Sequence, residues 1–287
     1  MQKIQITSDS TCDLSPELIE KFGIDILPLA VITDDEHLDQ VDLFPKDIFE
    51  YVKATKKLPK TAARSVADYE EFFRKHIEKG ETIVHTGIGN ELSASHRNAC
   101  EAAKNVAPDK IFVVDSRSLS TGTGLLVLAA CDMANSGKYT AQEIAETIAK
   151  RAPFVQASFV VETLDYLYKG GRCSALAMFG ANLLKIKPKL QVVDGKIVVS
   201  GKSLGKMIPV LKKYIDGELE KYSNPDKTRC FVTHATADQA LVDEIVEYVK
   251  SKNIFNEVYT TVAGSTITSH CGQGTLGILY INDGAKK

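Results

Sequence analysis

The chain has 287 residues, of which 44% are hydrophobic and 25% are charged. This composition is typical of a folded globular protein and excludes intrinsic disorder and collagen-like structure, and the length predicts about two domains. The 35 basic and 37 acidic residues leave a formal net charge of −2, which argues against a nucleic acid as the main partner, because phosphate-binding surfaces are strongly basic.

Membrane and secretion signals are not found in the sequence. The longest apolar run, residues 125–131, is far shorter than the roughly 18 residues that a membrane-spanning helix needs. The first residues lack the apolar segment of a signal peptide, so we expect a cytoplasmic protein without stable membrane insertion. The six cysteines form no C-x-x-C pair, which predicts buried, reduced thiols rather than a zinc site.

The first half of the chain alternates short β-branched runs with helical patterns. Ser15, Pro16 and Glu17 are typical of a helix start, and Ser65 with Asp68 resembles a capping box. Strands are expected at 3–7, 26–32, 82–86 and 111–115, and later helices at 45–55, 65–79, 93–106, 121–136 and 141–151. This alternation predicts a parallel sheet covered on both faces.

The second half has a different pattern. Pro153 interrupts a helical pattern and precedes a strand at 156–161. Asp194-Gly195 between two β-branched runs strongly predicts a hairpin. Further strands are expected at 229–233, 258–262 and 277–281, and helices at 206–221 and 237–252. We therefore expect an α/β protein of two domains, residues 1–153 with a parallel sheet and residues 154–287 with a mixed sheet that contains the hairpin.

Local catalytic motifs are incomplete. The segment 87–92 begins like a dinucleotide fingerprint, but Leu92 occupies the place of its third glycine. His270 and Cys271 would make a nucleophilic pair, but adjacent side chains rarely face each other. Neither a metal nor a cofactor is expected.

Hydroxylated and small residues recur where predicted strands end. The runs are 8–11, 93–95, 116–121 and 265–270. In open α/β sheets ligands bind at this edge, and hydroxyls with free helix N–H groups can bind a small anion. Helix capping explains each run alone, but the run 265–270 is followed by Gly272 and Gly274 rather than by a helical pattern.

Motifs along nearly the whole chain resemble the DegV family, which includes the FakB-type fatty-acid-binding proteins of bacteria. They are residues 9–14, 92–93, 114–116, 163–167, 170–172, 185–188 and 270–274. The resemblance implies a two-domain α/β protein that encloses one long-chain fatty acid and presents its carboxylate at the domain junction to a fatty acid kinase. It implies a carrier rather than an enzyme, with the chemistry supplied by the kinase.

The resemblance also implies a head-group site, in which Thr61, Ser93 and His270 bind the carboxylate and Arg172 lies near it. The family's usual Thr-Ser-Gln-Pro-Ser is replaced here by residues 61–65, which place a cation, Arg64, where a proline is usual. Arg64 either pairs with the carboxylate or stays solvated beside the predicted helix start. The expected ligand-binding residues are Thr61, Arg64, Ser93, Ser95, Arg172, His270 and Ser10.

A buried acyl chain would supply most of the affinity. About 14 methylenes at roughly 0.8 kcal/mol each contribute on the order of 11 kcal/mol before ordering costs, against ~1.5–3 kcal/mol for a hydrogen bond to a carboxylate. The apolar segments 125–130 and 175–184 are candidates for the lining. An enzyme acting on a small phosphorylated or carbonyl substrate, and a structural or regulatory module, are the alternative hypotheses.

Overall fold

The computed structural model describes residues 3–173 and 186–284. Its first large sheet is parallel throughout, with the strand order β2-β1-β6-β7. The strands are β1 (Ile4–Asp9), β2 (Asp25–Leu27), β6 (Thr82–Gly87) and β7 (Ile111–Asp115). The predicted N-terminal parallel sheet is confirmed.

The second large sheet is mixed, with the order β10-β9-β8-β13-β11-β12. Only its β11–β12 pair is parallel among the described pairings. Its strands are β8 (Val155–Val160), β9 (Ile186–Val193), β10 (Lys196–Leu204), β11 (Arg229–His234), β12 (Glu257–Val262) and β13 (Leu276–Ile281). Asp194 and Gly195 both have positive φ, 48° and 78°, as a tight hairpin turn requires. The predicted mixed sheet with a hairpin is confirmed.

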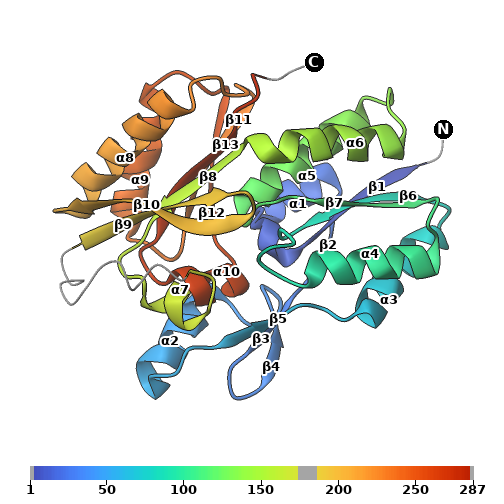
Figure 1. The fold of residues 1–287 in the computed structure, drawn as a ribbon, viewed down its shortest axis with the longest axis horizontal. Coiled ribbons are helices and arrows are strands. Elements are labelled where there is room, and N and C mark those ends of the chain that lie inside the picture. The colour runs from blue at the N-terminus through green and yellow to red at the C-terminus, as the bar shows by residue number, and fades with distance from the viewer. Residues whose placement is uncertain (1–2, 174–185, 285–287) are drawn as a thin grey trace.

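Helices form layers around the two sheets (Figure 1). α3 (Val66–Ile77) and α4 (Ser95–Val106) cover the parallel sheet, and α8 (Met207–Lys221) and α9 (Gln239–Ser251) cover the mixed sheet. α5 (Thr121–Asn135) contacts strands of both sheets, and α6 (Ala141–Arg151) packs beside it. Residues 121–131 are all buried, because α5 is apolar on every face and has a sheet on each side.

Local signals set several helix starts. Ser15 caps α1 (Pro16–Phe22), and Ser65 with Asp68 forms a capping box at the start of α3. Each cap satisfies backbone N–H groups that have no partner inside the helix. These caps confirm the expected helix starts.

A small antiparallel sheet was not predicted. It has the order β4-β3-β5, with β3 (Ala30–Ile32), β4 (Glu36–Leu38) and β5 (Lys60–Ala62). The expected single strand 26–32 is wrong, since it divides into β2 and β3, which belong to different sheets. Pro28 lies at the break, where it has no amide hydrogen to continue the ladder.

Three further helices lie near this small sheet in Figure 1: α2 (Pro45–Thr55), α7 (Asp165–Lys169) and α10 (Ser265–Cys271). α10 contacts α2, α7, β3 and β5, so a C-terminal helix packs against N-terminal elements. The expectation that 265–270 lies outside a helix is wrong.

The chain passes from the first large sheet to the second through α5, α6 and the short 3₁₀ helix η2 (Ala152–Phe154). We propose that the domain boundary at 153 lies in η2. All six cysteines are free, and five of them are buried, whereas Cys100 is only half-buried. Within residues 3–173 and 186–284, none of the helices combines the length and apolarity needed to cross a membrane.

Candidate functional site

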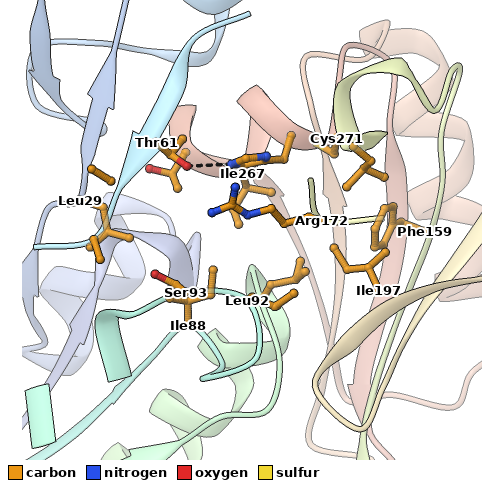
Figure 2. Close-up of a pocket in the computed structure, with 16 residues that line it drawn as sticks. Leu29, Thr61, Ile88, Leu92, Ser93, Phe159, Arg172, Ile197, Ile267 and Cys271 are labelled. Atoms are coloured by element: carbon orange, nitrogen blue, oxygen red, sulfur yellow. Dashed lines mark hydrogen bonds between the residues drawn. The ribbon is translucent and has the colours of Figure 1, made fainter. Parts of the chain in front are cut away.

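A pocket of about 590 Å³, counted to its open end, lies between the small sheet, α10 and the mixed sheet. This volume lies within the roughly 300–1,000 Å³ of typical small-molecule sites. The lining residues are Leu29, Thr61, Ala62, Ala63, Ile88, Leu92, Ser93, Leu119, Phe159, Leu167, Arg172, Ile197, Thr266, Ile267, His270 and Cys271. Figure 2 shows Thr61 and Ser93 on one side of the pocket and Phe159 and Ile197 on the other.

One end of the pocket is polar. Thr61 Oγ1 on β5 lies 2.8 Å from His270 Nε2 on α10, although the two residues are 209 positions apart. Ser93 Oγ also faces the pocket and lies 2.9 Å from Ser95 Oγ. Arg172 is exposed, and its Nη1 donates to the Gly170 carbonyl at 2.6 Å. Two hydroxyls, one imidazole and one guanidinium therefore converge.

His270 is neutral at neutral pH. Its burial, aided by the nearby Arg172 cation, lowers the pKa of the imidazole to about 4. The positive charge at this end of the pocket consequently comes from Arg172 rather than from His270.

Two buried carboxylates hold the start of α10. Asp13 Oδ1 accepts from the Gly264 amide at 2.8 Å, and Asp39 Oδ1 accepts from the Ser265 amide at 2.7 Å. Burial raises the pKa of both carboxyl groups. Because these acids belong to the N-terminal half, they fix α10, and with it His270, relative to β5.

The other end of the pocket is apolar and buried. Phe159, Ile197 and Ile267 are each less than 10% exposed. A second cavity of about 350 Å³ shares the walls formed by Leu119, Phe159, Ile267 and Cys271. The apolar end therefore continues toward the interior of the mixed sheet.

The β9–β10 hairpin closes one side of the pocket. Ile197 lies in the wall, and next to it Lys196 Nζ lies 3.4 Å from Glu91 Oε2. At the turn, Arg117 Nη2 lies 2.9 Å from Asp194 Oδ1. Two ion pairs at the surface thus join the hairpin tip to the N-terminal half.

The predicted site residues divide into two groups. Thr61, Ser93, Arg172 and His270 line the pocket, whereas Arg64, Ser95 and Ser10 are not among the lining residues.

The remaining three residues have other partners. Arg64 Nη2 pairs with Asp68 Oδ1 at 2.9 Å. Ser95 is buried against Ser93, and Ser10 Oγ donates to Asp39 Oδ2 at 2.8 Å. We therefore place the head-group site at the four lining residues.

Predictions for the apolar lining were less successful. Residues 125–130 belong to the core around α5 and do not line this pocket. The segment 175–184 lies outside the described residues. Sequence reasoning missed Leu29, Phe159 and Ile197, for which burial in a strand or turn gives no signal that a cavity lies beside them.

The family is decided by the whole chain rather than by the site. The sequence model of the DegV family, described as uncharacterised proteins, matches residues 3–283. The chain belongs to the DegV family. A fatty acid-binding protein of Thermotoga maritima is 30% identical over 96% of this chain and 96% of its own length.

Solved structures of DegV proteins share this fold. A fatty-acid-binding DegV protein of Thermus thermophilus has a TM-score of 0.86 at 25% identity, covering 98% of this chain and 99% of its own. A stearic acid-binding protein of Eubacterium ventriosum has a TM-score of 0.83 at 27% identity, covering 98% of both chains. The two-domain α/β fold of the family is therefore also that of this chain.

The catalytic alternatives find no support in this DegV chain. Burial raises the pKa of the Cys271 thiol to about 12, so the thiol is not a thiolate at neutral pH. A Cβ on Gly87 would lie 2.2 Å from Asp9 Oδ2, and one on Gly89 would lie 2.9 Å from the Ser118 amide nitrogen. Close packing against neighbouring loops explains both glycines without a bound dinucleotide.

Proposed function

We propose that this chain binds a long-chain fatty acid in the pocket, with the carboxylate at the polar end and the acyl chain at the apolar end. The observation that carries the proposal is a gradient of exposure. Arg172 is exposed, Thr61 and Ser93 are half-buried, and the apolar residues that line the opposite end are buried. A ligand with one charged end and a long apolar chain matches this gradient.

The polar groups suit a carboxylate. An ionised carboxylate only accepts hydrogen bonds, and the hydroxyls of Thr61 and Ser93 can donate them. The Arg172 guanidinium supplies the compensating charge, since His270 is neutral. Similarity to fatty-acid-binding DegV proteins supports the same ligand class.

We further propose that the protein is a cytoplasmic carrier that presents the bound carboxylate to a fatty acid kinase. A carboxylate oxygen would attack the terminal phosphoryl group of the kinase's nucleotide, which gives an acyl phosphate and releases the nucleoside diphosphate. The opening of the pocket at its polar end supports this role, because the reacting oxygen would face the partner. The raised pKa of the Cys271 thiol argues against a nucleophile in the pocket.

Native mass spectrometry of the purified protein, followed by lipid extraction, tests the ligand class. We expect one fatty acid per chain, because an empty apolar cavity forfeits the contacts of its lining. Recovery of no lipid, together with no binding of added palmitate, stearate or oleate, would refute the proposal. For the second step, hydroxylamine trapping of an acyl phosphate formed with a fatty acid kinase and ATP is the measurement, and it should require this protein.

A further inference from the structure

The end of α7 lies directly against the imidazole of His270. A Cβ built on Gly170 would lie 2.4 Å from His270 Nδ1 and 3.0 Å from Cε1. Real Cβ atoms essentially never approach other atoms to less than 3.0 Å. Any side chain at position 170 therefore requires the imidazole to move.

The backbone does not require this glycine. Gly170 has φ −75° and ψ −8°, which any L-residue adopts. Its neighbour Gly171 is the opposite case, since its φ is +71° and no described atom lies within 4 Å of a Cβ built there. Position 171 therefore needs glycine for its conformation, and position 170 needs it for space.

The turn is held in place over the ring. The Gly170 amide donates to the Tyr166 carbonyl at 2.9 Å, and the Arg172 amide donates to the Leu167 carbonyl at 3.1 Å. The Arg172 side chain also donates to the Gly170 carbonyl. Three hydrogen bonds thus resist a movement of the turn away from His270.

This contact leaves His270 one polar partner. Nδ1 is buried and has no hydrogen-bond partner in the described part of the chain, whereas Nε2 meets Thr61 Oγ1. A buried acceptor without a partner is tolerated better than a buried donor without one. The favoured neutral tautomer therefore carries its proton on Nε2 and donates it to Thr61, which leaves the threonine hydroxyl free to donate to a carboxylate.

We propose that Gly170 is a positioning residue of the head-group site, whose missing side chain lets α7 close over the Nδ1 edge of His270 and directs Nε2 to Thr61. This inference rests on the proposed function for its consequence, the binding of a carboxylate. Its geometric part concerns the imidazole alone. Tyr166 and the charged Arg172 are the titratable and charged neighbours of the ring in this contact.

Gly170→Ala tests the proposal, with Gly217→Ala as the matched control. Gly217 lies exposed in α8, and a Cβ there meets no described atom within 4 Å. Nitrogen-15 NMR of labelled histidine, assigned with His270→Gln, reports the tautomer and the pKa of the imidazole without ligand.

In Gly170→Ala we expect water to reach Nδ1, the pKa of His270 to rise from about 4 toward its ordinary 6.5, and oleate to bind about tenfold more weakly. Gly217→Ala should match the parent. An unchanged tautomer, pKa and oleate affinity in Gly170→Ala would overturn the proposal.

A double-mutant cycle covers the case in which Gly170→Ala folds poorly. In a His270→Ala background the added methyl group meets no imidazole, so Gly170→Ala should lower the melting temperature less there than in the parent. Equal losses in both backgrounds would also overturn the proposal. If the parent binds no fatty acid, the proposed function fails, while the NMR and the cycle still decide the role of Gly170.

Discussion

Removal of the Thr61 hydroxyl is the sharpest test of the head-group assignment, because it acts on both the free and the bound protein. Thr61→Val preserves the shape of the side chain. In the free protein it leaves His270 Nε2 without its partner, and Nδ1 has none among the described residues. A buried polar group left unpaired costs about 1–3 kcal/mol of stability. In the complex the variant also loses a bond to the carboxylate.

Ser93→Ala separates these two effects. Its Oγ meets Ser95 Oγ rather than the imidazole, so we expect little loss of stability in the free protein. A hydrogen bond to a charged group contributes about 1.5–3 kcal/mol, which corresponds to a roughly 10- to 150-fold loss of affinity. Thr61→Val should therefore weaken both binding and folding, and Ser93→Ala should weaken mainly binding.

Displacement of a fluorescent fatty acid by oleate, on delipidated protein, measures the affinities, and urea unfolding measures the stabilities. The reasoning is refuted if both variants bind oleate within about twofold of the parent, because a charge-assisted bond cannot be so weak in a partly buried site. Loss of stability in Ser93→Ala but not in Thr61→Val would contradict the assigned hydrogen bonds.

Three further predictions follow from other contacts. Arg64→Ala should leave oleate affinity within about twofold, because the guanidinium pairs with Asp68 and Glu36 outside the pocket and such pairs contribute little; a loss larger than that in Ser93→Ala would move the head-group site to Arg64. His76 bridges Asp25 and Glu81, which raises its pKa. It therefore contributes stability that is full below its unfolded pKa of about 6.5 and is lost as the pH rises through the folded value, so in urea unfolding His76→Gln should be more destabilising at low than at high pH between 5.5 and 8.5. Neutralising Glu91 and Arg117 together should speed oleate release in stopped-flow experiments about two- to tenfold and remove its dependence on salt, whereas Lys212→Gln, which breaks an exposed pair with Glu244, should not.

The large elements of the fold are predictable because their signals are local. Capping boxes, hairpin turns and alternating patterns each extend over a few residues, and the residues that form them are adjacent in the chain. The small sheet lacks such signals, since β3, β4 and β5 have three residues each. Strands so short are defined by their partners rather than by their own sequence.

The site is less predictable than the fold, because its hydroxyls are shared with other tasks. In the run 8–11, Ser8 donates to the Thr86 carbonyl and Ser10 to Asp39. In the run 116–121, Ser120 donates to Asp13, and Thr121 meets Thr233. Only the pocket decides that Ser93 is available to a ligand, and the pocket is made by segments far apart in the chain. The family resemblance supplied what local chemistry left open.

α10 shows most clearly why the site escapes local reasoning. A helix of seven residues is too short to be stable alone, and its Thr-Ile-Thr sequence has low helix propensity. It forms because Asp13 and Asp39, more than 220 positions away, accept the amides of Gly264 and Ser265. The same two bonds set the position of His270 at the other end of the helix. A pattern search reads 265–270 as a loop for the physical reason that makes it useful, since its structure is supplied by the domain junction that it helps to form.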